Sequence, residues 1–358
     1  MKRKKLLCAL LAAALVCSLL PITALAYDPG DFANTSWFGQ FTGTHNNDLI
    51  NRYIDFTINS CDQQGNFTGS AKITSVEGQG ANFDSIWYTY DFVGKIDFST
   101  NAFSMWLDQV TGHPSNITVL QEQGYEGVIQ QSANGELRMV GTYYDSRVKD
   151  LPFSASRTSA WARESMTEAN IAGLIPDTLK DADMTRPITR AEFTAVAVKL
   201  YESLTGAPAP SASAPFADIA ANPNKGDIEK AFSLNIAVGL SATEFAPDDA
   251  INREQLATML CRVVKKYRFA DWNLASDSQY VLDTSDVALF ADDADISAFA
   301  KPSVYYMAKM GIIQGVTDVL FAPKNITSEQ EAQGYATATR EQAIILALRI
   351  YQQADQLK

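Results

Sequence analysis

The chain has 358 residues, and its 41 acidic residues against 29 lysines and arginines give a net charge of −12 at neutral pH. Because phosphate binding needs a basic surface, this balance argues against a nucleic-acid partner. The 4 cysteines are too few for the disulfide framework of a small secreted domain, so packed cores must stabilise the chain.

A basic start and an apolar stretch open the chain. Residues 2–5 are all lysine or arginine, residues 6–20 are apolar, and Ala24-Leu25-Ala26 has the small-x-small pattern of a cleavage site. This order predicts a signal peptide over residues 1–26. The apolar stretch is too short for a stable membrane span and no later segment is apolar enough, so we expect an exported chain with no span after cleavage.

Residues 27–157 carry the pattern of a β domain. Ile54, Phe56 and Ile58 alternate with polar residues, and the same alternation returns at 86–92, 103–107 and 137–141. Such alternation predicts half-buried strands. At five places a large apolar residue stands two positions before a glycine, as at Phe67 and Gly69. Glycines within strands mark bends or close backbone approach. We therefore predict a small all-β domain, a sandwich or an up-and-down barrel of roughly seven or eight strands with a lipocalin- or avidin-like pattern.

The chemistry of this β domain is not written in an obvious motif. His45 and His113 are the only histidines, and neither has a second ligand or acid at close spacing, so we predict no catalytic, metal or cofactor site there. Trp37, Trp87 and Trp106 can line a sugar surface or fill the core, and the small size of the barrel favours the core. A lipocalin-type barrel would instead hold a closed apolar cavity for a small molecule.

The second half of the chain repeats. Thr189–Glu192, Asn252–Gln255 and Thr339–Gln342 each match the capping-box spacing at a helix start. Apolar residues follow each start at i, i+3, i+4, i+7 and i+8, which is one face of an α-helix. The repetition predicts three helices that begin in the same way.

An arginine stands at the first helical position in all three copies, at Arg190, Arg253 and Arg340. A cation at this end of a helix costs about 0.3–1 kcal/mol, because it opposes the helix macrodipole. Beside free helix N–H groups it makes a site for a carboxylate or phosphate. The alternative is that each arginine pairs with a nearby acid. Geometry alone leaves both interpretations open.

Further motifs stand in a fixed order around these helices. They are Phe-x-Asp at 216–218 and 290–292, Trp-Ala at 161–162, glycine turns ending at Gly239 and Gly315, Phe-x-Pro at 245–247 and 321–323, and Ile-Thr-Arg-Ala-Glu at 188–192. Residues 158–358 therefore resemble three tandem S-layer homology (SLH) domains. The resemblance implies one pseudo-threefold all-α domain whose grooves bind pyruvylated secondary cell-wall polysaccharide. It implies carbohydrate-binding roles for Arg190, Arg253 and Arg340, for Thr189 and Glu192, and for Trp161, Gly239 and Gly315 at or near the grooves.

The three repeats are unequal. We predict them at 158–206, 216–270 and 271–358, with a low-complexity linker without core-forming residues at 207–215. Repeat one lacks Phe-x-Pro and has Pro176-Asp177 in place of the glycine turn, repeat two lacks Trp-Ala, and repeat three has Phe299 for tryptophan and an insertion of 11 residues before Arg340. We expect a surface loop at the insertion and one or more degenerate pockets.

We therefore expect a secreted protein held on the cell wall of a Gram-positive-type bacterium, with the β domain displayed for an unknown ligand or protein partner or as a spacer. Catalytic motifs of the Ser-His-Asp, Cys-His or His-x-x-x-His type are missing from the sequence, which predicts that the chain is not an enzyme. The alternative is a wall-anchored carbohydrate-active enzyme, because paired acids among Asp48, Asp55, Asp91 and Asp97 would suffice for glycoside hydrolysis.

Overall fold

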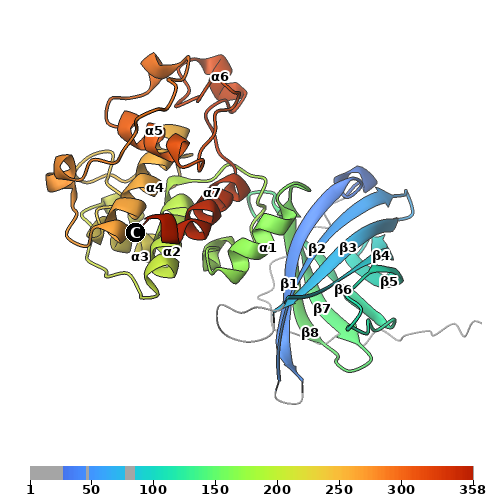
Figure 1. The fold of residues 1–358 in the computed structure, drawn as a ribbon. Coiled ribbons are helices and arrows are strands. Elements are labelled where there is room, and N and C mark those ends of the chain that lie inside the picture. The colour runs from blue at the N-terminus through green and yellow to red at the C-terminus, as the bar shows by residue number, and fades with distance from the viewer. Residues whose placement is uncertain (1–26, 46–47, 77–84, 358) are drawn as a thin grey trace, which may run out of the picture.

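The computed structural model describes residues 27–357 apart from 46–47 and 77–84, so the predicted signal peptide lies outside the described residues. An N-terminal barrel and a C-terminal helical part follow each other along the chain (Figure 1). In the described part, no helix has the length and apolar character needed to cross a membrane.

Eight antiparallel strands close into a barrel in which each strand pairs with the next and β1 pairs with β8. This confirms the predicted all-β fold and selects the barrel over the sandwich. A short 3-10 helix, η1 (Pro29–Asp31), precedes the barrel. The strands are β1 (Thr35–His45), β2 (Asp48–Cys61), β3 (Asn66–Val76), β4 (Ser85–Asp97), β5 (Ala102–Gly112), β6 (Gln123–Gln131), β7 (Leu137–Asp145) and β8 (Leu151–Thr158).

The aromatic-x-glycine pattern has a direct packing reason on β3 and β4. Gly69 pairs with Phe92, and Gly94 pairs with Phe67. A Cβ on Gly69 would lie 2.3 Å from the Phe92 ring, and a Cβ on Gly94 would lie 2.2 Å from the Phe67 ring. Each glycine thus leaves room for the ring of the neighbouring strand, which lets large aromatic side chains fill a narrow barrel.

Side chains fill the barrel interior. Phe41 stacks on Tyr143 with ring centroids 4.2 Å apart, and Tyr125 lies 4.7 Å from Phe153. Among the described residues the barrel offers a polar mouth pocket of about 150 Å³, lined in part by Tyr88 and Gln123. This packed aromatic interior favours core filling over the closed apolar cavity of a lipocalin-type barrel.

The three barrel tryptophans do not share one environment. Trp37 is fully buried in the core, whereas Trp87 is 37% and Trp106 is 43% exposed on the outer surface. Core filling thus holds for Trp37 alone, because the outward positions of β4 and β5 carry the other two rings.

The helical part contains the three predicted helices, each with its arginine as the first residue. Thr189, Asn252 and Thr339 are the N-caps, and all three capping boxes are complete. Cys61 and Cys261 are both free thiols. The α-helices are α1 (Arg163–Ile171), α2 (Arg190–Thr205), α3 (Lys225–Ser233), α4 (Arg253–Arg268), α5 (Lys301–Lys309), α6 (Ser328–Ala332) and α7 (Arg340–Gln352), and 3-10 turns are η2 (Asp177–Leu179), η3 (Ala217–Ile219), η4 (Leu274–Gln279), η5 (Asp293–Asp295) and η6 (Ala354–Leu357).

The segments before α2, α4 and α7 tie the repeats into a ring. Isolated β-bridges join Thr189 to Ala250, Asn252 to Thr337, and Pro187 to Thr339. One continuous apolar core runs through all three repeats. Ala209 of the linker is buried in this core, so the expectation of no core-forming residues there is wrong. The insertion of repeat three is not all loop, because it contains α6.

Helix α1 lies between the barrel and the other helices (Figure 1). Phe38 and Tyr53 of the barrel stack on each other at 6.3 Å and belong to the helical core. Arg163 of α1 donates to Thr57 at 3.1 Å and lies 3.5 Å from Asp55. Burial raises the pKa of Asp55. The barrel and repeat one therefore share a packed interface.

Candidate functional site at the repeat junctions

Arg190 begins α2 of repeat one and reaches into repeat two. Its Nε donates to the carbonyl oxygen of Phe245 at 3.0 Å, and its Nη2 donates to that of Val238 at 3.3 Å. The guanidinium also lies 4.9 Å from the centroid of the Phe245 ring. Burial lowers the pKa of Arg190, yet a guanidinium stays charged at neutral pH. We call this contact between repeats one and two the first junction.

Arg253 repeats this arrangement at the second junction, between repeats two and three. Its Nε donates to the carbonyl oxygen of Phe321 at 2.8 Å, and its Nη2 donates to that of Gln314 at 2.7 Å. The guanidinium lies 5.2 Å from the centroid of the Phe321 ring. Burial lowers the pKa of Arg253 as well. At both junctions the hydrogen bonds of the arginine go to neutral carbonyl groups. Carboxylates act on it only through space, Asp249 and Asp218 on Arg190 and Asp292 on Arg253.

Gly239 and Gly315 directly follow the carbonyl groups that accept from these arginines. A Cβ at Gly239 would lie 2.4 Å from the carbonyl oxygen of Ser241, and one at Gly315 would lie 2.2 Å from that of Thr317. Any side chain would push the turn open. The two predicted glycines therefore shape the turn that presents a carbonyl to the arginine.

The aspartates of the two Phe-x-Asp motifs support the same turns. Asp218 accepts hydrogen bonds from the backbone N–H groups of Phe245 and Ala246, and Asp292 accepts from Phe321 and Ala322. Ala246 and Ala322 have φ values of 57° and 58°, which are unfavourable for alanine. We did not predict these aspartates as site residues. The available signal was that an aspartate recurs as the third residue of the repeated Phe-x-Asp motif.

Arg340 departs from the other two arginines. Its Nε and Nη2 donate to both carboxylate oxygens of Glu192, at 3.1 and 2.6 Å. Its Nη1 donates to Glu136 at 2.8 Å and to the carbonyl oxygen of Asp183 at 2.9 Å. Burial by itself would lower the pKa of Arg340, but Glu192 and Glu136 raise it above its ordinary value. At this third junction the alternative of pairing with acids applies.

Thr189 and Glu192 act first as helix caps. Thr189 Oγ1 accepts from the Glu192 N–H at 3.2 Å, and Glu192 Oε2 accepts from the Thr189 N–H at 3.0 Å. The Glu192 carboxylate then serves Arg340 of repeat three. Glu192 thus joins two repeats, a role that the local sequence pattern does not contain.

Two exposed aromatic rings lie at equivalent places beside the second and third junctions. Trp161 is 60% and Phe299 is 61% exposed. Each stands two residues after a serine whose N–H donates at 2.8 Å to the glutamate after the arginine, Ser159 to Glu341 and Ser297 to Glu254. Lys324 adds a cation 3.6 Å from Glu254. The predicted Trp161 therefore belongs to the third junction, whereas Phe299 belongs to the second.

The histidines add no evidence of chemistry. The His113 ring contacts the carbonyl oxygen of the next residue at 2.8 Å, and the side chain of His45 lies outside the described residues. Within the described ranges, no group of three His, Cys, Asp or Glu side chains is placed to hold a metal ion.

Comparison with known proteins bears on the helical part. Residues 215–257 and 289–332 match the family model of the S-layer homology domain. These two segments are S-layer homology domains. The first begins one residue before the predicted second repeat and otherwise lies in it, and the second lies in the predicted third repeat. They imply a cell-surface protein that is anchored to the cell wall.

Three curated relatives are similar to this chain, mainly in the S-layer homology region. An endoglucanase of Bacillus sp. (strain KSM-635) is 30% identical over 198 residues, covering 54% of this chain and 19% of the relative. The exoglucanase XynX of Acetivibrio thermocellus is 29% identical, covering 56% and 17%. An amylopullulanase of Thermoanaerobacterium thermosulfurigenes is 28% identical, covering 48% and 8%. The chain thus spans about one fifth or less of the length of these relatives.

Proposed function

We propose that the chain is exported to the surface of a Gram-positive-type bacterium and is held on the wall by an acidic, pyruvylated secondary polysaccharide. The observation that carries this proposal is the pair of guanidinium groups of Arg190 and Arg253. Both are fixed by neutral carbonyl groups, so both keep a positive charge for an acidic sugar substituent. Gly239 and Gly315 shape the two turns, and Thr189 and Glu192 cap the helix that carries Arg190.

Aromatic stacking on the sugar rings is part of this proposal. The exposed Phe299 lies at the second junction, where Lys324 pairs with Glu254, and offers an apolar face there. Trp161 offers the same face at the third junction, where Arg340 is already paired with two acids. We therefore assign acid recognition to the first and second junctions, and a stacking contact to Trp161.

The test uses the whole mature chain and purified cell-wall sacculi. We expect co-sedimentation with native sacculi and its loss on sacculi from which the secondary polymer has been removed by acid. A second comparison uses native sacculi in which only the pyruvyl groups have been hydrolysed. Equal binding to all three preparations would contradict the polysaccharide mechanism, and equal binding to the first and third would contradict the role of pyruvate.

For the barrel we propose a non-catalytic role, as a displayed binding surface or a spacer. The side-chain-filled interior and the ion pair of Asp55 with Arg163 support this role. The second candidate is a carbohydrate-active enzyme; the three relatives carry the names of such enzymes, but they are similar to this chain mainly in the S-layer homology region. Incubation of the mature chain with cell-wall polysaccharide, xylan or cellulose decides between them. Release of reducing sugar above a heat-inactivated control would contradict the non-catalytic role.

A further inference from the structure

The first repeat lacks the Phe-x-Asp motif whose aspartate supports a turn in the other two repeats. The corresponding turn is identified by its hydrogen bond to the next helix. The residue after each arginine donates its N–H to a carbonyl oxygen, from Ala191 to Pro247, from Glu254 to Pro323 and from Glu341 to Met184. The residues before these acceptors are therefore equivalent. They are Ala246, Ala322 and, in repeat one, Asp183.

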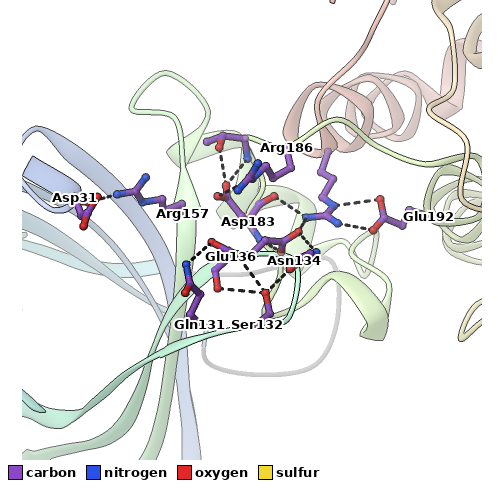
Figure 2. Close-up of polar contacts among 12 residues, drawn as sticks. Asp31, Gln131, Ser132, Asn134, Glu136, Arg157, Asp183, Arg186 and Glu192 are labelled. Carbon is purple, nitrogen blue, oxygen red and sulfur yellow. Dashed lines mark hydrogen bonds and ion pairs between the residues drawn. The ribbon is translucent and has the colours of Figure 1, made fainter. Parts of the chain in front are cut away.

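The N–H of Asp183 nevertheless donates a hydrogen bond to a carboxylate, and this carboxylate comes from the barrel. Glu136 Oε2 accepts from the Asp183 N–H at 2.9 Å. In the other repeats Asp218 and Asp292 accept from Ala246 and Ala322 at 2.7 Å. Figure 2 shows Glu136 beside Asp183, with Glu192 facing them from the helical part. Glu136 thus makes the contact that an aspartate makes in repeats two and three.

The turn between β6 and β7 fixes the Glu136 side chain. The Glu136 N–H donates to Ser132 Oγ at 3.0 Å, and Asn134 Nδ2 donates to Glu136 Oε1 at 2.8 Å. Gly135 supplies the positive φ of 85° that the tight turn needs. Glu136 is 9% exposed, and its second oxygen accepts from Arg340. Contacts within the barrel turn therefore orient this carboxylate in addition to its contacts with the repeats.

We propose that the barrel supplies the part that the first repeat lacks. The turn between β6 and β7 fills the third junction of the same chain. Glu136 takes the place of the missing aspartate, and its carboxylate binds Arg340 at the position where an acidic ligand would bind. Together with Glu192 it places two negative charges against one guanidinium. The barrel is thus a structural part of the anchoring region, and a fragment that starts at residue 158 lacks this support. That the third junction takes no acidic sugar rests on the proposed function, whereas the structural role of Glu136 does not.

The experiment compares two glutamate variants of the whole mature chain. Glu136→Ala removes the carboxylate, and Glu126→Ala removes an exposed one from the preceding strand β6. We expect the first to lower the melting temperature by about 5 °C and the second to change it by less than about 1 °C. Amide hydrogen exchange followed by mass spectrometry is expected to rise about tenfold at 183–186 and 340–341, with no change at 245–246.

Glu136→Gln keeps the shape of the side chain and tests the charge if the alanine variant does not fold. Combined with Arg340→Gln, it is expected to lower the melting temperature by clearly less than the sum of the single effects. Equal behaviour of the Glu136 and Glu126 variants, or additive effects of Glu136 and Arg340, would overturn the proposal. Neither readout involves polysaccharide, so a failure of wall binding with these results intact would count against the proposed function alone.

Discussion

Arg340 and Glu192 form a two-pronged ion pair that joins the third repeat to the first, with Nη2 and Oε1 2.6 Å apart and Nε and Oε2 3.1 Å apart. The residues equivalent to Glu192 in the other capping boxes are Gln255 and Gln342. Repeat one therefore brings a carboxylate where the other repeats bring a neutral amide. The carboxylates of Glu192 and Glu136 together distinguish the third junction from the other two.

The first prediction concerns these two carboxylates. Glu192→Gln gives repeat one the amide of the other repeats and keeps the capping box, and Glu136→Gln removes the second charge. In the double variant Arg340 retains the carbonyl oxygen of Asp183 as a neutral acceptor. We expect severalfold tighter binding of this variant to native sacculi, measured by co-sedimentation, because the Arg340 guanidinium loses both of its carboxylate partners. Unchanged or weaker binding by a folded double variant would count against assigning acid recognition to the carbonyl-bound arginines of the first and second junctions.

The second prediction concerns Asp218, the aspartate that supports the turn of repeat two at Phe245 and Ala246. Asp218→Asn weakens the charged acceptors of the Phe245 and Ala246 N–H groups, and it leaves Ala246 at positive φ. We expect the free energy of unfolding to fall by about 1–3 kcal/mol in urea titrations. The matched control is Glu244→Gln, which changes an exposed charge in the same turn and is expected to be neutral within about 0.5 kcal/mol. A variant as stable as the control would show that the turn does not need the carboxylate.

The third prediction concerns pH. Burial by itself would raise the pKa of Glu136 and of Asp218, but hydrogen bonds from backbone N–H groups, with Arg340 adding to those on Glu136, hold both below their ordinary values. A depressed acid pKa contributes stability that is present above the unfolded value and is lost as pH falls through the folded value. We therefore expect the melting temperature to fall progressively from about pH 4.5 downwards.

Scanning calorimetry of the mature chain between pH 3 and pH 7 checks this expectation. Asp55 and Asp227 act in the opposite direction, because burial raises the pKa of each. The Glu136→Gln variant is expected to lose less of its stability across the acidic range than the unmodified chain. A parallel decline of the two proteins would mean that Glu136 does not contribute to the acid sensitivity.

Much of the fold follows from local sequence patterns. The alternation around Ile54, Phe56 and Ile58 reports a strand because its apolar side faces a core, and Thr189 with Glu192 reports a helix start because a cap is a local hydrogen-bond pattern. The exposed Trp87 and Trp106 went against the expectation of core filling, since a ring of that size can lie on either face of a strand.

The pairing of Arg340 with acids at the third junction could not be predicted from the sequence, for a physical reason. Glu136 meets Asp183 and Arg340 across 47 and 204 positions of the chain, and spacing in sequence carries no information on contacts between domains. The choice between an arginine facing an acidic ligand and one facing a protein acid depends on that packing. Only the repeated position of Arg190, Arg253 and Arg340 was visible locally.

The most direct test of wall anchoring measures the binding of two whole-chain variants and of the unmodified chain to native sacculi at several salt concentrations. We predict that Arg190→Ala combined with Arg253→Ala abolishes binding and its salt dependence, because both guanidinium charges that would meet the acidic sugar are lost. We predict that Arg340→Ala, although less stable, binds at 15 °C as the unmodified chain does. Full binding by the Arg190 and Arg253 double variant, or loss of binding by folded Arg340→Ala, would contradict this account.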